Sequence, residues 1–206
     1  MTENCDPSST NIPPYMRERA VQMKELYALV GEFVVSFEAI LGEMRQHLAF
    51  FMCHSGSTSM SDIYALTGEM TAGPLLSSYV SIMISHCQEG DRPYFVALSS
   101  RIRKMTEQRN TIVHGTWFVG YGNGPQTDFS VGFGEKVKNS NTGVMHRKLK
   151  LTEADFRPLI KECWALADLV TGMTLSVTLG RSVTGFCELS GSDSQTLRRR
   201  QDTPPV

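Results

Sequence analysis

The residues best suited to chemistry stand in one short stretch of the chain, from Arg109 to Trp117. Arg109, Asn110 and His114 lie within six residues, at the end of a segment whose pattern predicts an amphipathic helix. Arginine keeps its proton in proteins and binds a phosphate through two parallel hydrogen bonds. Histidine takes up or releases a proton near neutral pH. Cleavage of a phosphodiester without a metal ion needs these two groups, so the stretch indicates phosphodiester chemistry.

The same residues also have a purely structural explanation. A histidine in the last turn of a helix interacts favourably with the helix dipole. An arginine on an apolar stripe can pair with a carboxylate, and Glu38 or Glu43 of the first predicted helix can supply one. Glu38 can alternatively tune His114, or lie on a solvated flank. Short spacings of Arg and His are common, so spacing by itself favours the structural explanation.

Apolar residues three and four positions apart predict a long first helix, from about Tyr15 to Met52. A second helix is expected from near Ser61, whose hydroxyl can cap it, with a kink or break at 73–74 where Gly precedes Pro. The third is expected over about 91–114 and the fourth over about 152–180. The helical segments together account for most of the chain.

Between the third and fourth helices the pattern changes to alternation, which predicts an antiparallel hairpin or three-stranded meander over about 117–151. The expected fold is mainly α: an antiparallel four-helix bundle with this β-insertion before the last helix. The helical domain is expected to span 14–180. Residues 1–13 are expected to be a disordered arm and residues 181–206 a flexible tail.

The composition narrows the classes of function. The 206 residues carry 20 Lys and Arg against 21 Asp and Glu, so RNA binding would need a local basic patch. The five cysteines are scattered and contain no CxxC, which favours reduced thiols and a cytoplasmic location. The most apolar segment, 26–52, holds four charged side chains, so no membrane span is expected.

Two groups of basic residues can contact RNA phosphates. One is a helical face before the motif and the other is a predicted strand, and for both the alternative is an ordinary solvated face. The residues are Arg101, Arg103 and Lys104 on the helix, with Arg147 and Lys148 on the strand.

Two Cys/His pairs invite a zinc interpretation, 53–54 and 86–87. In a helical hairpin they would stand roughly 30 Å or more apart, because about 24 helical residues separate them. Zinc ligands lie near 2 Å from the metal. No metal site is therefore predicted, and no cofactor.

The motif resembles the signature of the HEPN superfamily (higher eukaryotes and prokaryotes nucleotide-binding domains). That signature is an arginine, a polar residue directly after it, and a histidine after four to six intervening residues, as in Arg109, Asn110 and His114. The resemblance implies a helical bundle, and many members are metal-independent endoribonucleases that act as dimers. Some are toxins or phage-defence effectors, while others only bind or scaffold. The β-insertion departs from the family's minimal bundle.

With the resemblance added, we expect a homodimeric endoribonuclease that leaves a 2′,3′-cyclic phosphate. Arg109 would hold the scissile phosphate and His114 would act as acid and base. Asn110 would orient the imidazole or donate to the phosphate. Five residues turn an ideal helix by about 500°, which leaves Arg109 and His114 about 140° apart. A second copy is therefore expected to complete the site, and an antitoxin protein is a candidate partner. The alternative is a non-catalytic module for dimerisation or nucleotide binding.

Overall fold

The chain divides into two compact units in the computed structural model. The smaller unit joins Met1–Gly31 with His114–Phe156, and the larger joins Glu32–Val113 with Arg157–Val206. Residues 1–13, the expected disordered arm, lie outside the described part of the chain. The structure describes residues 14–56, 59–114, 116–119, 132–140, 143–190 and 196–200.

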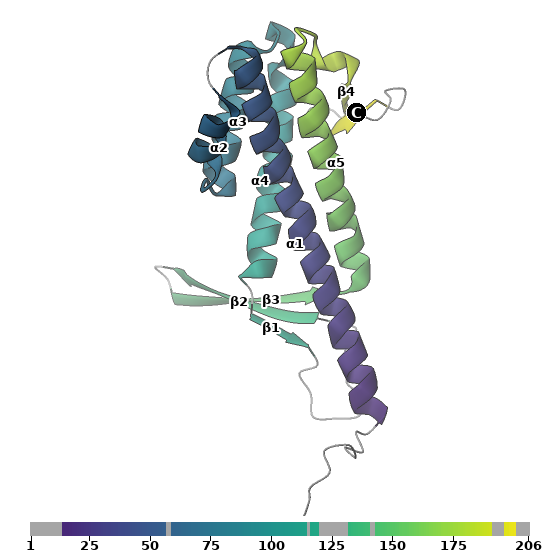
Figure 1. Cartoon of the computed structure of the whole chain (residues 1–206). Helices are drawn as coiled ribbons and strands as arrows, with labels where there is room; N and C mark the ends of the chain where they lie inside the picture. Colours follow the sequence, from purple (N-terminus) through teal and green to yellow (C-terminus); the bar gives the residue numbers. More distant parts are fainter. Residues whose placement is uncertain are drawn as a thin grey trace, which may run out of the picture. The chain divides into compact units, whose positions relative to one another are not determined.

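Helices make up most of the described chain, as the spacing of apolar residues predicted (Figure 1). The first and last helices each begin in the smaller unit and continue into the larger one. A short 3-10 turn, η1 (Glu89–Asp91), precedes the fourth helix. The helices are α1 (Pro14–His54), α2 (Met60–Thr67), α3 (Ala72–His86), α4 (Arg92–Val113) and α5 (Glu153–Thr178).

The core of the larger unit forms where the apolar stripes of α1, α3, α4 and α5 meet. Complete burial of one such side chain contributes about 1.5–3 kcal/mol. No described helix is both long and apolar enough to cross a membrane. The largest fully buried side chains of the unit are Phe33, Phe37, Tyr79 and Phe95.

Helices α1 and α5 run in the same direction through the larger unit. Nη1 of Arg157, near the start of α5, lies 3.4 Å from Oε2 of Glu32 on α1. Thr171, further along α5, donates to Glu43, further along α1, at 3.0 Å. From the first contact to the second, the residue numbers increase along both α1 and α5, so the two helices are parallel.

Helix α3 also runs with α5, whereas α4 runs against both. The hydroxyl of Tyr79 on α3 donates to the carbonyl of Val170 on α5 at 3.3 Å, and Gln88, after α3, donates to the carbonyl of Gly180, after α5, at 3.1 Å. The chain then turns through η1, and α4 returns. The prediction of a mainly helical chain with a small antiparallel sheet is confirmed. The fully antiparallel order is not what these contacts show.

The difference arises in the second predicted helix, which is two helices. Helix α2 is capped by Ser59, whose hydroxyl accepts from the backbone N–H of Asp62, rather than by Ser61. After α2 the chain turns, and Arg45 of α1 donates to the carbonyls of Thr67 and Met70 at 3.2 and 3.0 Å. The break thus precedes residues 73–74, and α3 starts afresh in the direction of α1.

The predicted β-insertion is a three-stranded antiparallel sheet in the smaller unit. Its strands are β1 (Thr116–Val119), β2 (Gly132–Ser140) and β3 (Gly143–Leu151), in the order β1-β2-β3. Each strand pairs with its sequence neighbour, which is the meander that alternation predicted.

The prediction of a flexible tail after residue 180 is wrong for the described part of that segment. A 3-10 turn, η2 (Val183–Gly185), leads into an antiparallel pair, β4 (Cys187–Ser190) and β5 (Thr196–Arg199). The carboxylate of Asp91, 1% exposed, accepts from the hydroxyl of Ser182 at 2.7 Å and from the backbone of Val183 at 3.1 Å. These distant contacts hold the segment, and strands of four residues carry too little periodicity to predict it.

A glycine in α5 makes close packing of this segment possible. A Cβ at Gly172 would lie 2.1 Å from the ring of Phe186. We expect Gly172→Ala to destabilise the protein by about 1–3 kcal/mol, because the ring must move. Urea unfolding measures the change.

The matched control is Gly42→Ala in α1, where a Cβ would meet no described atom of another element within 4 Å. This substitution is expected to stabilise the protein by up to about 1 kcal/mol through helix propensity. Equal effects of the two substitutions would contradict the packing role of Gly172.

Candidate functional site

Arg109 lies on the buried stripe of α4, between its last two buried residues. The residues one turn to either side on this stripe, Met105 and Ile112, are each 3% exposed, while the side chain of Arg109 keeps 24% of its surface exposed. A charged group in this position needs partners, because burial of an unpaired charge is costly.

Neighbours on α1 and α4 surround the guanidinium of Arg109. Its Cζ lies 5.8 Å from the ring centre of Phe37, and Nη2 lies 3.4 Å from Oε1 of Glu38. Nη1 donates to Oδ1 of Asn110 at 3.3 Å. Both polar distances exceed the usual range for N–H···O bonds, so these contacts are weak. The buried Nε of Arg109 has no hydrogen-bond partner among the described residues.

The sequence predicted that either Glu38 or Glu43 pairs with Arg109, and in the structure the partner is Glu38. The Glu38 side chain is 47% exposed, and a pair of this exposure stabilises a protein by about 1 kcal/mol or less. Arg109 is therefore oriented by Phe37 and Glu38 without being saturated by them.

His114 is exposed and directly follows Val113, the last residue of α4. Asn110 is partly exposed and stands four positions before His114, which is the spacing of residues on one helix face. The motif thus presents an imidazole at the helix end and an amide one turn earlier.

The residues predicted to contact RNA separate into distinct environments. Arg101 donates to Glu162 of α5 at 2.7 and 2.9 Å, so its charge is neutralised. Arg103 and Lys104 are exposed on α4. The predicted strand residues, 147–148, lie on β3, and their side chains fall outside the described part of the structure.

Sequence reasoning missed a second titratable cluster in the larger unit. Nε2 of His47 lies 3.1 Å from Oε2 of Glu43, and the same oxygen accepts from Thr171. Burial, partly offset by Glu43, lowers the pKa of His47. The signal in the sequence was a Glu and a His four positions apart on one helix, which is a common surface pattern.

The zinc argument from the sequence used a wrong geometry. Because α3 runs parallel to α5 and α1, His86 lies at the end of α1, where its ring centre is 5.0 Å from that of Phe51. The 53–54 and 86–87 pairs are therefore not at opposite ends of a hairpin. Even so, no group of three or more His, Cys, Asp or Glu within the described ranges is arranged to hold a metal ion.

The described cysteines are free thiols. Burial raises the pKa of Cys163 to about 12 and that of Cys187 to about 12. Neither therefore supplies a thiolate near neutral pH.

Comparisons of the chain with protein families, characterised proteins and solved structures find no match.

The pKa of His47 makes stability depend on pH in a defined direction. A histidine whose pKa is lower in the folded than in the unfolded state favours unfolding when it is protonated. We expect the free energy of unfolding to be highest above pH 6.5, the ordinary pKa of a histidine. It should decrease as the pH falls from 6.5 through the lowered pKa that His47 has in the folded protein. Urea unfolding on both sides of pH 6.5 tests this.

The variant His47→Gln keeps a donor for Glu43 and does not titrate, so its stability should change less with pH in this window. The control is His54→Gln, at the exposed end of α1. A His47→Gln profile as steep as that of the wild type would rule out His47 as the cause.

Proposed function

We propose that this chain is a metal-independent endoribonuclease of the HEPN type that acts as a homodimer. The observation that carries the proposal is the state of Arg109. Its guanidinium is held by Phe37 and Glu38 at a partly exposed position, yet its polar contacts are long and its Nε is unsatisfied within the described residues. A phosphate could accept shorter, charge-assisted bonds from it.

The proposed reaction uses the 2′-hydroxyl of the substrate. One imidazole of His114 accepts the 2′-OH proton while O2′ bonds to phosphorus. The bond from phosphorus to O5′ breaks, and the His114 imidazole of the second copy gives a proton to O5′. The products are a 2′,3′-cyclic phosphate and a 5′-hydroxyl. Arg109 stabilises charge on the phosphoryl oxygens, and Asn110 orients the imidazole or the phosphate.

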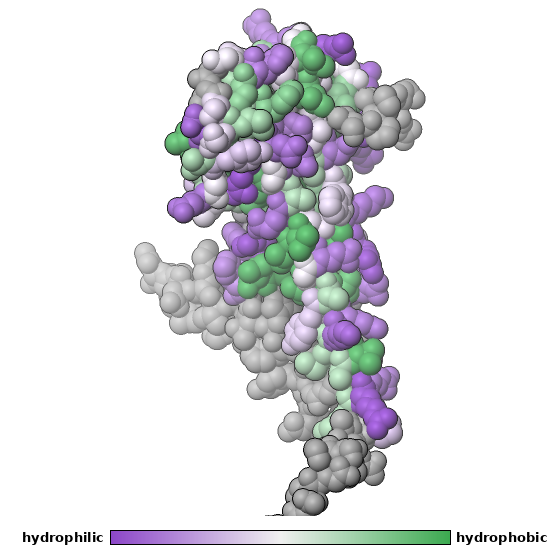
Figure 2. Space-filling model, in the orientation of Figure 1, coloured by the Kyte–Doolittle hydropathy of each residue, from purple (hydrophilic) through white to green (hydrophobic). Residues whose placement is uncertain are grey.

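Two features support a site shared between copies. Arg109 and His114 are about 140° apart on an ideal helix, so the second copy is the simplest source of a facing histidine. Exposed apolar residues lie within the motif and near its partner on α1: Val113 is 37% exposed, and Val35, three positions before Glu38, is 68% exposed. Apolar side chains gather over the middle of α1 on the face that Figure 2 shows. Such patches suit a contact with another protein surface.

The second candidate is a non-catalytic HEPN-like module for dimerisation or nucleotide binding. The pair between Arg109 and Glu38 favours it, because this pair gives Arg109 a structural role. The exposure of His114 speaks for the enzyme, because a purely structural histidine would be expected to be buried and hydrogen-bonded. In either case an antitoxin protein, in a toxin–antitoxin or phage-defence setting, is a proposed partner.

Cleavage of RNA in the presence of EDTA tests the enzyme. We expect Arg109→Ala and His114→Ala each to lower the rate by about a hundredfold or more, since each removes a group that acts on the reacting atoms. Matched controls are Arg181→Ala and His54→Ala, which remove an exposed residue of the same type elsewhere. Cleavage of DNA is not expected, because the reaction needs the 2′-hydroxyl.

Glu38→Gln should lower the rate less than Arg109→Ala, because Glu38 positions the arginine and does not contact the phosphate. Rates that survive both Arg109→Ala and His114→Ala would end the proposed mechanism. An absolute need for a divalent ion would end its metal independence.

A mixing experiment tests the shared site. Wild type and His114→Ala are unfolded and refolded together in equal amounts, so that about one quarter of the dimers hold two intact copies. If one cleft needs both histidines, activity should fall to roughly one quarter of that of the same total wild-type protein. Roughly one half would mean that each copy acts alone. Mixing with Arg181→Ala should leave the activity unchanged.

A further inference from the structure

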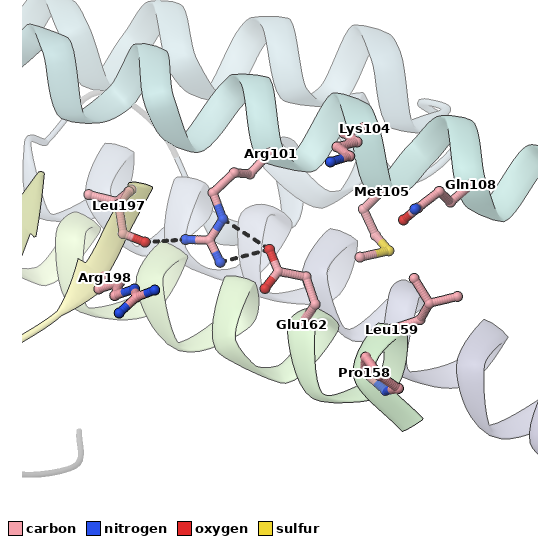
Figure 3. Close-up of a pocket in the computed structure, with 9 residues that line it drawn as sticks. All are labelled: Arg101, Lys104, Met105, Gln108, Pro158, Leu159, Glu162, Leu197 and Arg198. Carbon is pink, nitrogen blue, oxygen red and sulfur yellow. Dashed lines mark hydrogen bonds and ion pairs between the residues drawn. The ribbon is translucent and has the colours of Figure 1, made fainter. Parts of the chain in front are cut away.

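A groove with a volume of about 470 Å³ lies between α4 and α5 of the larger unit, with β5 at one end (Figure 3). The side chains that line it are mixed in character: three are cationic, one is a carboxylate, one is an amide and four are apolar. They are Arg101, Lys104, Met105, Gln108, Pro158, Leu159, Glu162, Leu197 and Arg198.

An ion pair forms the wall in the middle of the groove. Arg101 reaches across from α4, where its Nε and Nη2 donate to one oxygen of Glu162 on α5. Its Nη1 donates to the backbone carbonyl of Leu197 on β5. These short contacts join three elements and neutralise the Arg101 charge, so they shape the groove without leaving a cation for a ligand.

Two other cations remain for an anionic ligand. Lys104 and Arg198 are exposed, and neither has an ion pair among the described residues. With three positive side chains and one negative, the lining carries a net charge of two positive. Backbone phosphates of a nucleic acid match this charge.

The apolar part of the lining determines what kind of strand fits. On α5, Pro158 is exposed and Leu159 is partly exposed, and the nearly buried Met105 of α4 points into the same space (Figure 3). The amide of Gln108 offers both a donor and an acceptor at that end. A base can lie against such a surface and be read by the amide only if it is unpaired, as in single-stranded RNA.

The groove also reaches the level of the motif along the axis of α4. It follows α4 from Arg101 to Gln108, about 10 Å along the helix axis, and Gln108 directly precedes Arg109. We propose that this groove binds an unpaired segment of RNA next to the phosphate that Arg109 holds. Its place beside a cleaved phosphate rests on the proposed function, whereas binding of single-stranded RNA does not.

Binding is measured without cleavage, by fluorescence anisotropy of a single-stranded RNA whose 2′-hydroxyls are methylated. We expect Lys104→Ala and Arg198→Ala each to weaken binding about threefold to tenfold. Each should also lower the slope of log affinity against log salt concentration by about 0.7. The matched control is Arg92→Ala, because Arg92 is exposed at the start of α4 and does not line the groove. Circular dichroism melting checks that the variants fold.

Three outcomes would overturn the proposal: wild-type affinity in both Lys104→Ala and Arg198→Ala, equal weakening by Arg92→Ala, or equally tight binding of a duplex of the same sequence. Displacement of the RNA by an equal charge concentration of polyglutamate would assign the groove to an acidic protein partner instead.

The two proposals fail separately. If the wild type cleaves RNA in EDTA while both groove variants bind normally, only the groove assignment is lost. If the groove variants weaken binding but no cleavage occurs, only the nuclease is lost.

Discussion

A charged guanidinium on an apolar stripe constrains how α1 and α4 pack in the larger unit. Arg109 cannot lose its charge, so α4 can pack here only where a neighbouring helix supplies a ring face and a carboxylate. Phe37 and Glu38 stand side by side on α1 and supply both. The packing of α1 on α4 accommodates the pair between Arg109 and Glu38, and the polar contacts of Arg109 are long enough for a ligand to compete with them.

Helix α4 uses a second arginine in the opposite way. Arg101, about 12 Å earlier along the helix axis, makes short bonds to Glu162 and to the backbone of β5. A close pair of this kind is structural, because a ligand phosphate would have to displace a carboxylate already in contact. Arg101 is thus held by short contacts with two other elements, whereas Arg109 is held by long contacts and is the arginine that the proposed reaction uses.

The segment after α5 belongs to this arrangement. Arg199 binds both oxygens of Asp168 at 2.8 and 3.0 Å and lies over the ring of Phe186, which itself packs on α5 at Gly172. Since Arg198 directly precedes Arg199 on β5, the contacts that hold β5 also place a cation at the end of the groove. The position of Arg198 therefore follows from the packing of β5 and not from its place in the run of three arginines, 198–200.

Local patterns in the sequence predicted the helical segments, the three-stranded meander and the motif, because each depends on residues a few positions apart. They left Glu38 and Glu43 as alternative partners for Arg109, and the structure pairs Arg109 with Glu38. The tertiary structure decided the directions of the helices, the pair of Glu43 with His47, and the β4–β5 hairpin. These depend on contacts such as Arg45 with the carbonyl of Thr67, or Asp91 with Ser182, that join residues far apart in the chain. Periodicity reports which face of an element is buried, but not against which partner, and only packing of the whole chain settles that.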